Sequence, residues 1–548
     1  MKHSLKPPAI AATLLLGMFI SIALLSGLSK AWAEDWPAWT GPLGRNASPD
    51  KGLPETFYRD ALENVRWAAK LGTVAFGSPT VSQGKVFIGT NCPTVRDDPR
   101  FSETDGGVVV CLDESSGEVI WRLVCPARVE GLHPKAHMIH QRWGICSSPT
   151  VDGKYVYFVT NGDDVLCLDS RGLADGNDGP FQDEAAFMAG SNRPPVELQD
   201  TDGDIVWRYD IPGELSVAPH DVGSCSVLIH GDVLYTSTSN GIGIDSPVYA
   251  LNPSAPAFIA LDKRTGQLLA VEDEGISERL FHAQWSSPSK GRIGEQHLIL
   301  LGGADGVCYA FKPFSREKSA EQINATSSGK LKTQWQYDCN PLHYKQRDGK
   351  RIYYYQGDVR VYRNKRRAGQ DTEGFNSNDG SFIGPNEIIA TPVFYENRVY
   401  IATGRDPSHG LGKGVLHCID ATQTGDITDT GCVWRYEEFG RTLSTVAVDK
   451  GLVYAADLAG RLHCLDAKTG KVYWFHDTEQ ELWGNPLVAD NKVYVNTRQA
   501  LWIFAAGKEK NVLFMHPGGS ECPPIAANGV VYAFVRGRLY AFAVNSHD

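Results

Sequence analysis

The chain has 548 residues, a formal net charge of −11 at pH 7, 56 glycines and 30 prolines. An acidic chain of this kind lacks the positive surface that nucleic acid requires, so we exclude nucleic acid as a partner. Short runs rich in Val, Tyr and Ile, separated by Gly and Pro, predict an all-β chain of many brief strands. The length alone suggests several domains, but a chain of this length can also form a single domain when it consists of repeats that close into a ring, as the repeats described below indicate.

The first residues have the pattern of an export signal. Lys2 and Lys6 precede an apolar stretch over 9–28, and Ala-Trp-Ala follows at 31–33. This order of charge, apolar run and small residues predicts a signal peptide over residues 1–33, cleaved near Ala33. We therefore expect a periplasmic or secreted protein without a transmembrane domain after cleavage. The apolar stretch is also long enough for an uncleaved anchor, and the sequence leaves that alternative open. A lipid-modified N-terminus is not expected, because the first cysteine is Cys92.

A degenerate repeat recurs eight times and determines the fold class. Its first half is clearest at 78–88 (SPTVSQGKVFI), and its second half at 111–121 (CLDESSGEVIW). Further copies of the first half begin at residues 148, 226, 287, 391, 445, 485 and 523. Each unit predicts about four strands joined by tight turns that contain Gly or Asn. Eight such sheets around an axis predict a single eight-bladed β-propeller of four-stranded antiparallel blades over residues 34–548.

The two ends of the chain are expected to meet in one blade. The last unit ends without a fourth strand, whereas residues 64–67 (NVRW) resemble a fourth strand that precedes the first repeat. We expect this N-terminal strand to complete the eighth sheet and to close the ring, because closure removes an open sheet edge. Insertions are predicted at 124–146, 170–204 and 312–388. Most of them fall on one face of the propeller, and only 170–204 falls on the opposite face.

Two residue types recur at fixed repeat positions and are predicted to be structural. A tryptophan on the fourth strand is expected to dock between neighbouring sheets, at Trp121, Trp207, Trp335, Trp434 and Trp474. A cysteine before Leu-Asp or Ile-Asp is expected to be a buried thiol and not half of a disulfide, at Cys111, Cys167, Cys418 and Cys464. The other cysteines leave a disulfide open.

The second half of the repeat, Leu-Asp-x-x-Thr-Gly-x-x-x-Trp, resembles the PQQ-like propeller repeat over essentially all of residues 62–545. That superfamily includes quinoprotein alcohol dehydrogenases and the non-catalytic outer-membrane assembly factor BamB. The chain is most similar to exported PQQ-like propeller proteins of planctomycete-type bacteria. The resemblance implies the fold and leaves the function open, because this fold carries both enzymes and scaffolds.

Candidate binding residues lie in the loops that lead into the innermost strands and in the enlarged loops beside them. Each of the loops that lead in ends at a small residue that is expected to crowd the axis. Loops of both kinds share one face, so their side chains are expected to converge at an axial mouth. The alternative is that these polar groups only cap strand ends. The candidates are Arg142, Trp143, His220, Asp221, His282, Gln284, Trp285, Asn386, Glu387, Asp406, His409, Arg441 and Trp483.

Four shorter segments resemble known site motifs or charge clusters. The motif HPKAHMIH contains His133, His137 and His140, which in a helix would share one face and form a weak candidate metal or haem site. The alternative, histidines in a surface loop, is commoner. The segment DTDGD at 200–204 resembles half of a calcium loop, but Ile205 replaces the required glycine, so we expect a turn. GRDPSHGLGKG at 404–414 joins two strands and is not a phosphate loop. The basic run at 360–367 is expected to be a solvated loop.

Two functions follow from these observations. We favour a binding or assembly scaffold similar to BamB, with a protein, peptide or glycan partner. The alternative is a PQQ-dependent quinoprotein oxidoreductase, in which calcium is held by Asp221, Asn386 or Glu387 beside an arginine (Arg142 or Arg441) and a tryptophan (Trp285 or Trp483). Against it, the sequence has no adjacent Cys-Cys pair and no C-x-x-C-H haem motif. A hydrolase that uses His220 and Asp221 lacks a recognisable nucleophile. Catalytic residues, PQQ and calcium therefore stay unassigned.

Overall fold

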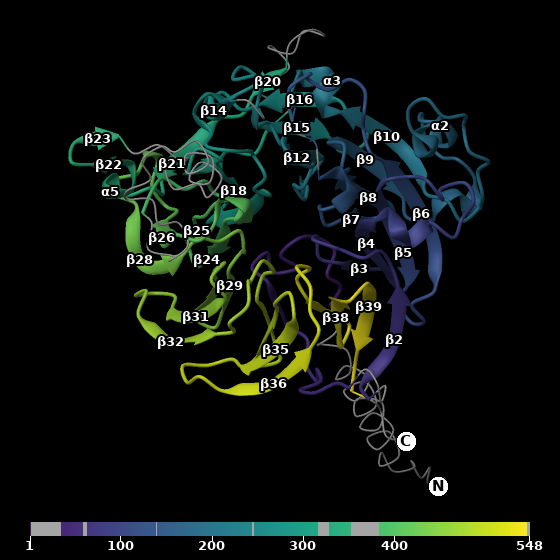
Figure 1. Cartoon of the computed structure of the whole chain (residues 1–548). Helices are drawn as coiled ribbons and strands as arrows, with labels where there is room; N and C mark the ends of the chain where they lie inside the picture. Colours follow the sequence, from purple (N-terminus) through teal and green to yellow (C-terminus); the bar gives the residue numbers. More distant parts are fainter. Residues whose placement is uncertain are drawn as a thin grey trace, which may run out of the picture.

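The computed structural model describes residues 1, 34–58, 63–136, 138, 140–243, 246–315, 328–351 and 383–544. Eight sheets surround a central axis, which confirms the predicted eight-bladed β-propeller (Figure 1). The predicted signal segment and the basic run at 360–367 lie outside the described residues. Within the described ranges, the helices are all too short or too polar to cross a membrane.

Each blade is built from four antiparallel strands, counted here from the axis outward. Blades 1 to 4 comprise β3 (Thr80–Ser82), β4 (Lys85–Asn91), β5 (Gly106–Asp113) and β6 (Val119–Pro126); β7 (Thr150–Asp152), β8 (Tyr155–Val159), β9 (Asp164–Asp169) and β10 (Asp204–Asp210); β11 (Leu228–His230), β12 (Val233–Ser237), β15 (Phe258–Asp262) and β16 (Leu268–Val271); and β17 (Ser289–Ile293), β18 (Gln296–Gly302), β19 (Val307–Phe311) and β21 (Thr333–Asp338).

The remaining blades follow the same order, except that the fourth strand of blade 8 comes from the N-terminal part of the chain. Blades 5 to 8 comprise β24 (Val393–Tyr395), β25 (Arg398–Ala402), β26 (Lys413–Asp420) and β28 (Cys432–Gly440); β29 (Ala447–Asp449), β30 (Leu452–Ala456), β31 (Arg461–Asp466) and β32 (Val472–Asp477); β33 (Leu487–Ala489), β34 (Lys492–Asn496), β35 (Ala500–Ala505) and β36 (Val512–Pro517); and β37 (Ile525–Ala527), β38 (Val530–Val535), β39 (Arg538–Phe542) and β2 (Val65–Lys70).

Short additional elements decorate the blades. They are β1 (Ala47–Ser48), β13 (Ile242–Gly243), β14 (Ser246–Ala250), β20 (Gly329–Lys330), β22 (Gln346–Arg347), β23 (Lys350–Arg351) and β27 (Gly425–Asp426), with the helices η1 (Cys92–Val95), η2 (Gln141–Trp143), η3 (Gly172–Asp175), α2 (Glu184–Ala189), α3 (Ile211–Leu215), α4 (Ile276–Arg279), α5 (Leu342–Lys345) and η6 (Pro407–His409). Strands β20 and β27 add parallel fifth strands to blades 3 and 4.

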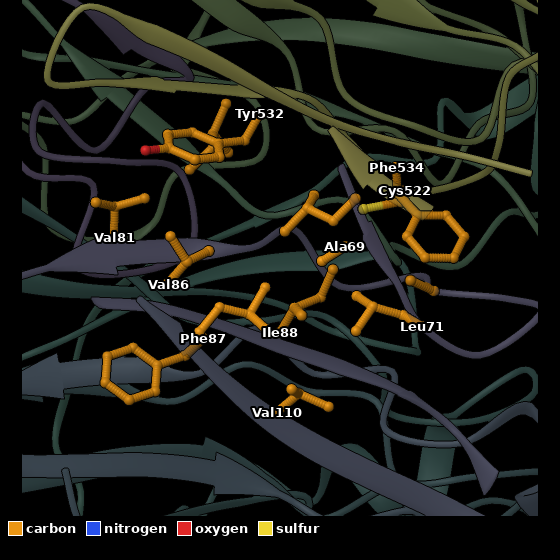
Figure 2. Close-up of a cluster of buried hydrophobic side chains, with 14 of the residues drawn as sticks. Ala69, Leu71, Val81, Val86, Phe87, Ile88, Val110, Cys522, Tyr532 and Phe534 are labelled. Carbon is orange, nitrogen blue, oxygen red and sulfur yellow. The ribbon is translucent and has the colours of Figure 1, made fainter. Parts of the chain in front are cut away.

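The ring closes as the sequence predicts. Strand β2 pairs antiparallel with β39, from Val65 opposite Phe542 to Lys70 opposite Arg538. Figure 2 shows the apolar seam that results, in which side chains of blade 8 face those of blade 1. The labelled residues of this seam are Ala69, Leu71, Val81, Val86, Phe87, Ile88, Val110, Cys522, Tyr532 and Phe534. Closure therefore buries a continuous core between the first and the last blade.

The fourth-strand tryptophans dock on the next blade. The indole Nε1 of Trp434 donates to the carbonyl of Ala467, at 3.0 Å, and its ring lies against Gly470. Gly470 has a φ of +72°, and a Cβ at this position would lie 2.6 Å from the ring. The tryptophan of each such blade thus packs against the Thr-Gly turn of the next blade. The same indole-to-carbonyl bond is made by Trp67, Trp121, Trp207 and Trp474.

A second set of contacts joins the innermost strands around the axis. The backbone N–H of Ser148 donates to the hydroxyl of Ser226, and that of Ser226 donates to the hydroxyl of Ser287, both at 2.9 Å. Blades 5 to 7 repeat this arrangement through Thr391, Thr445 and Asn485. The predicted small residues crowd the axis, since a Cβ at Gly77 would lie 2.7 Å from the backbone of Ser147.

The first described segment, residues 34–58, crosses the face opposite the predicted mouth; we call it the strap. It begins at blades 8 and 1, where Asp35 accepts hydrogen bonds from Ser82 and Asn528. It ends at blade 7, where β1 pairs parallel with β33. Between these points it bonds to blades 2, 5 and 6, and Figure 1 shows this purple segment near the centre of the ring. The strap therefore ties together blades that are far apart around the ring.

All twelve cysteines are free thiols. The four at the predicted repeat position are buried, as expected, and each of the other eight is unpaired as well. The disulfide that the sequence left open is absent from the described residues.

Candidate functional site

A cavity of about 160 Å³ lies on the propeller axis. Every blade contributes to it the residue that stands immediately before its small axial residue. In blade order these are Phe76, Cys146, Ser224, Trp285, Ile389, Leu443, Trp483 and Glu521. A second tier comes from the inter-blade hydrogen-bonding position, with Ser226, Ser287, Thr391, Thr445 and Asn485. Residues at equivalent positions of all eight repeats therefore form this axial pocket.

The strap closes the far end of the axial pocket. Trp39 lines the cavity, and its indole Nε1 donates to the hydroxyl of Thr391 at 2.8 Å. The next strap residues bond to blade 6, where Arg45 donates to the carbonyl of Val448 at 2.9 Å. Because the strap crosses the opposite face, Trp39 lines the cavity from the side that faces away from the loops that lead into the innermost strands.

Five of the predicted residues line this cavity together. They are Trp143, Asp221, Trp285, Asp406 and Trp483. The aromatic members form a wall with Phe76, whose ring centroid lies 5.3 Å from that of Trp143 and 6.1 Å from that of Trp483. Each of these aromatic residues is only partly buried.

Asp221 is held by a neighbour in the loop that leads into blade 2. Its Oδ1 lies 3.1 Å from Nδ1 of His140, and its backbone carbonyl accepts the N–H of the same residue at 3.3 Å. The His140 ring also stacks on Trp143, with centroids 3.8 Å apart. This arrangement fixes one carboxylate and one aromatic wall of the pocket relative to each other.

Three buried histidines form a row behind Trp285. The ring of His282 lies 4.4 Å from that of His220, 4.7 Å from that of His409 and 5.0 Å from that of Trp285, measured between centroids. Nδ1 of His220 lies 2.6 Å from the carbonyl oxygen of Ile242. These histidines support the pocket wall and do not line the cavity.

The remaining candidates also lie outside the cavity lining, and most of them join loops. Gln284 donates to Gly302 and accepts the N–H of Ala304, both at 2.8 Å. Asn386 and Arg441 bond to backbone carbonyls of the 404–414 loop region, at Lys413 and Leu411 respectively. Glu387 accepts the N–H of Asp406 at 3.0 Å, whereas Arg142 is exposed. For these residues the geometry matches the capping alternative.

The described residues of the histidine pattern at 133–140 are not helical. The described residues 131–136, 138 and 140 are in turns and loop, and His137 lies outside the described residues. The described residues therefore match the commoner alternative of a surface loop, and His133 and His140 do not share the face of a helix, because Pro134 lies in a turn. The DTDGD segment is a turn, as predicted, in which Asp202 forms an ion pair with Arg100.

The chemistry available in the pocket is limited. Burial raises the pKa of the Cys146 thiol to about 12, so this lining cysteine is protonated at neutral pH and is not an activated nucleophile. Within the ranges that the structure describes, groups of three or more His, Cys, Asp or Glu side chains that would hold a metal ion are absent.

A sequence model of the family described as "Outer membrane protein assembly factor BamB" matches residues 60–178 and 412–542, which span repeats at both ends of the ring. Over these residues the chain is similar to the PQQ-like β-propeller repeat family. No curated protein matches the chain in sequence.

Three solved structures resemble this one at low identity. BamB from Moraxella catarrhalis is 13% identical, with 88% of this chain and 98% of that chain covered and a TM-score of 0.48. The computationally designed Ika8 protein is 10% identical, with 88% and 99% covered and a TM-score of 0.45. A quinohemoprotein alcohol dehydrogenase from Pseudomonas putida HK5 is 13% identical, with 86% and 76% covered and a TM-score of 0.44. At these values the likeness carries no inference about function.

The described lining does not fit the cofactor that the resemblance implies. Pyrroloquinoline quinone carries carboxylate groups, whereas the cavity is lined by Asp221, Asp406 and Glu521 and by no Lys or Arg among the described residues. Carboxylate side chains that line the cavity would repel the carboxylate groups of this cofactor. The volume of about 160 Å³ is also below the roughly 300–1,000 Å³ of sites that enclose a whole organic ligand.

Proposed function

We propose that this PQQ-like propeller is an exported binding or assembly protein, which takes a small group of its ligand or protein partner into the axial pocket. The observation that supports the proposal is the convergence of one side chain from every blade on one axial cavity. Strand capping alone does not require that convergence, whereas a ligand site does. The absence of a cationic lining among the described residues favours this function over a quinoprotein dehydrogenase.

The proposal is tested by thermal unfolding of the purified protein in the presence of a panel of small amines, sugars, short peptides, and PQQ with calcium. A ligand that binds only the folded state raises the melting temperature. We expect at least one amine, sugar or peptide to do so, and we expect the shift to disappear in Trp483→Ala. Trp502→Ala is the matched control, because Trp502 lies in the same blade but outside the cavity.

Two outcomes would overturn the proposal. One is a panel in which no amine, sugar or peptide shifts the melting temperature. The other is PQQ-dependent dye reduction that wild-type protein and Trp502→Ala perform and Trp483→Ala does not, since that result would make the axial pocket a quinone site.

A further inference from the structure

We propose that the axial pocket recognises an organic cation, namely an alkylammonium head group held against aromatic faces between carboxylates. This inference rests on the proposed function and specifies its ligand class. The cation belongs either to a free amine or to a lysine side chain of a protein partner. Both sources present the same chemistry to the pocket.

The aromatic content of the pocket supports a cation. Five aromatic side chains from the strap and four different loops surround one small cavity: Trp39, Phe76, Trp143, Trp285 and Trp483. The face of an aromatic ring carries partial negative charge and attracts a cation within about 6 Å of its centroid, and tryptophan is the strongest such partner. Rings that surround a single cavity are the arrangement that binds quaternary ammonium groups in proteins.

The charged lining points the same way. Asp221, Asp406 and Glu521 line the cavity, and the described part of the lining contains no Lys, Arg or His side chain. Two of these carboxylates are already oriented, Asp221 by His140 at 3.1 Å and Glu521 by Arg498 at 2.7 Å. A partly enclosed pocket with acidic walls concentrates cations and repels anions.

One wall of the pocket already carries a cation on its outer side. The guanidinium carbon of Arg498 lies 5.1 Å from the ring centroid of Trp483, and this arginine pairs with Glu481 and Glu521. Arg498 does not line the cavity; it borders a separate hollow with Gln480 and Arg536. The outer side of this wall therefore shows the same combination of tryptophan, carboxylate and cation that we propose for the cavity.

The polar side chains of the second tier argue against a sugar. The side-chain oxygens of Ser226, Ser287, Thr445 and Asn485 accept backbone N–H groups of the preceding blade, and that of Thr391 accepts the Trp39 indole. Sugar recognition needs several converging donors and acceptors that are available to the hydroxyl groups of the ligand. Here these oxygens already join the blades, and the small cavity suits a compact head group whose remainder extends into the mouth.

The test uses a pair of probes that differ only in charge. Choline and 3,3-dimethyl-1-butanol have nearly the same shape, but only choline is a cation. We expect isothermal titration of the full-length protein to give choline an affinity at least about tenfold higher than that of the neutral alcohol. Choline binding should be lost in Trp143→Ala and Trp483→Ala, retained in Trp502→Ala, and weakened in Asp221→Asn and at high salt.

A second pair of probes distinguishes the two sources of the cation. A short peptide with one central lysine is compared with the same peptide carrying norleucine. Tighter binding of the lysine peptide than of choline assigns the pocket to a protein partner, and the reverse order assigns it to a free amine. Both results support a cation site.

Equal binding of choline and the neutral alcohol would overturn the cation proposal, and so would binding of a neutral sugar in the same pocket in place of choline. In those cases the Trp483→Ala variant still loses the ligand, so the proposed binding function stands and only its ligand class is wrong. If no probe binds in a manner that depends on Trp483, both proposals fail.

Discussion

The backbone N–H of Thr391 in blade 5 donates to the hydroxyl oxygen of Thr445 in blade 6, at 2.9 Å. Thr445 in turn donates its own N–H to Oδ1 of Asn485 in blade 7, at 2.7 Å. These residues occupy the same repeat position and are buried. The Ser, Thr or Asn that opens most repeats is therefore an acceptor that joins neighbouring blades around the axis.

Replacing Thr445 by valine tests this role. Thr445→Val leaves the N–H of Thr391 buried without its acceptor, so we expect the free energy of unfolding to fall by about 1–3 kcal/mol. Thr445→Ser keeps the oxygen and is the matched control, which should be closer to wild type. Urea denaturation of the three proteins measures the difference, and a loss in Thr445→Val no larger than that in Thr445→Ser would contradict the acceptor role of the Thr445 hydroxyl.

The packing of Trp434 on Gly470 is tested by comparing an alanine substitution at Gly470 with one at Gly451. Gly451 has a similar positive φ (+75°) but nothing within 4 Å of a Cβ, whereas a Cβ at Gly470 would lie 2.6 Å from the indole. We expect Gly451→Ala to cost about 1–2 kcal/mol, the backbone strain alone. Gly470→Ala should cost clearly more, because the Trp434 ring must also move. Thermal denaturation that ranks the two variants equally would contradict the docking role.

The fold was predictable from the sequence because each blade repeats the same local pattern. The spacing between Asp466 and Trp474 recurs in other units, and the structure places that tryptophan opposite Cys464 on the neighbouring strand. The closing strand was predictable for the same reason, since Trp67 stands in phase with the other fourth-strand tryptophans. The spacing of the sequence repeat thus predicts both the number of blades and the register of the strands within each blade.

The site was only partly predictable. Five of the predicted residues line the axial cavity. Others, such as Asn386 and Gln284, were chosen for their chemistry, and the structure shows them bonded to backbone carbonyls at strand ends. The position within the repeat predicts the lining better than side-chain chemistry does. Phe76 and Trp483 line the cavity, and each of them directly precedes a small axial residue. Trp39 had no such signal, because it precedes all repeats and bonds to Thr391, 352 residues away.

Removing residues 1–70 should cause a large loss of stability relative to a chain that lacks only residues 1–33. The longer truncation deletes β2, which leaves β39 as an open edge, and it also removes the strap. We expect a loss above about 5 kcal/mol or failure to fold, since one buried tryptophan alone is worth about 3–5 kcal/mol. Trp67→Ala in the intact chain is the milder variant, with an expected loss of about 3–5 kcal/mol by chemical denaturation. An unchanged midpoint in either variant would contradict closure by β2.

Because the carboxyl of Asp204, at the start of β10, is buried, we expect the stability of the folded protein to depend on pH. Burial raises its pKa from the usual 3.8 to about 7, although the N–H of Asp178 bonds to its carboxylate, and the nearby Glu184 and Asp169 add to the increase. Between these two pH values the folded state holds a proton that the unfolded state has released. The contribution of Asp204 to stability is therefore full below about pH 4 and is lost as the pH rises toward 7.

Asp204→Asn removes this titration while it keeps an oxygen that accepts the N–H of Asp178. We expect the variant to gain stability relative to wild type as the pH is raised from 5 to 8, because only the wild type must bury a charge at the higher pH. Urea denaturation at both pH values measures the change, with Asp200→Asn in the same turn as an exposed control that should show no such trend. A constant difference between Asp204→Asn and wild type across this range would mean that the carboxyl of Asp204 does not titrate there.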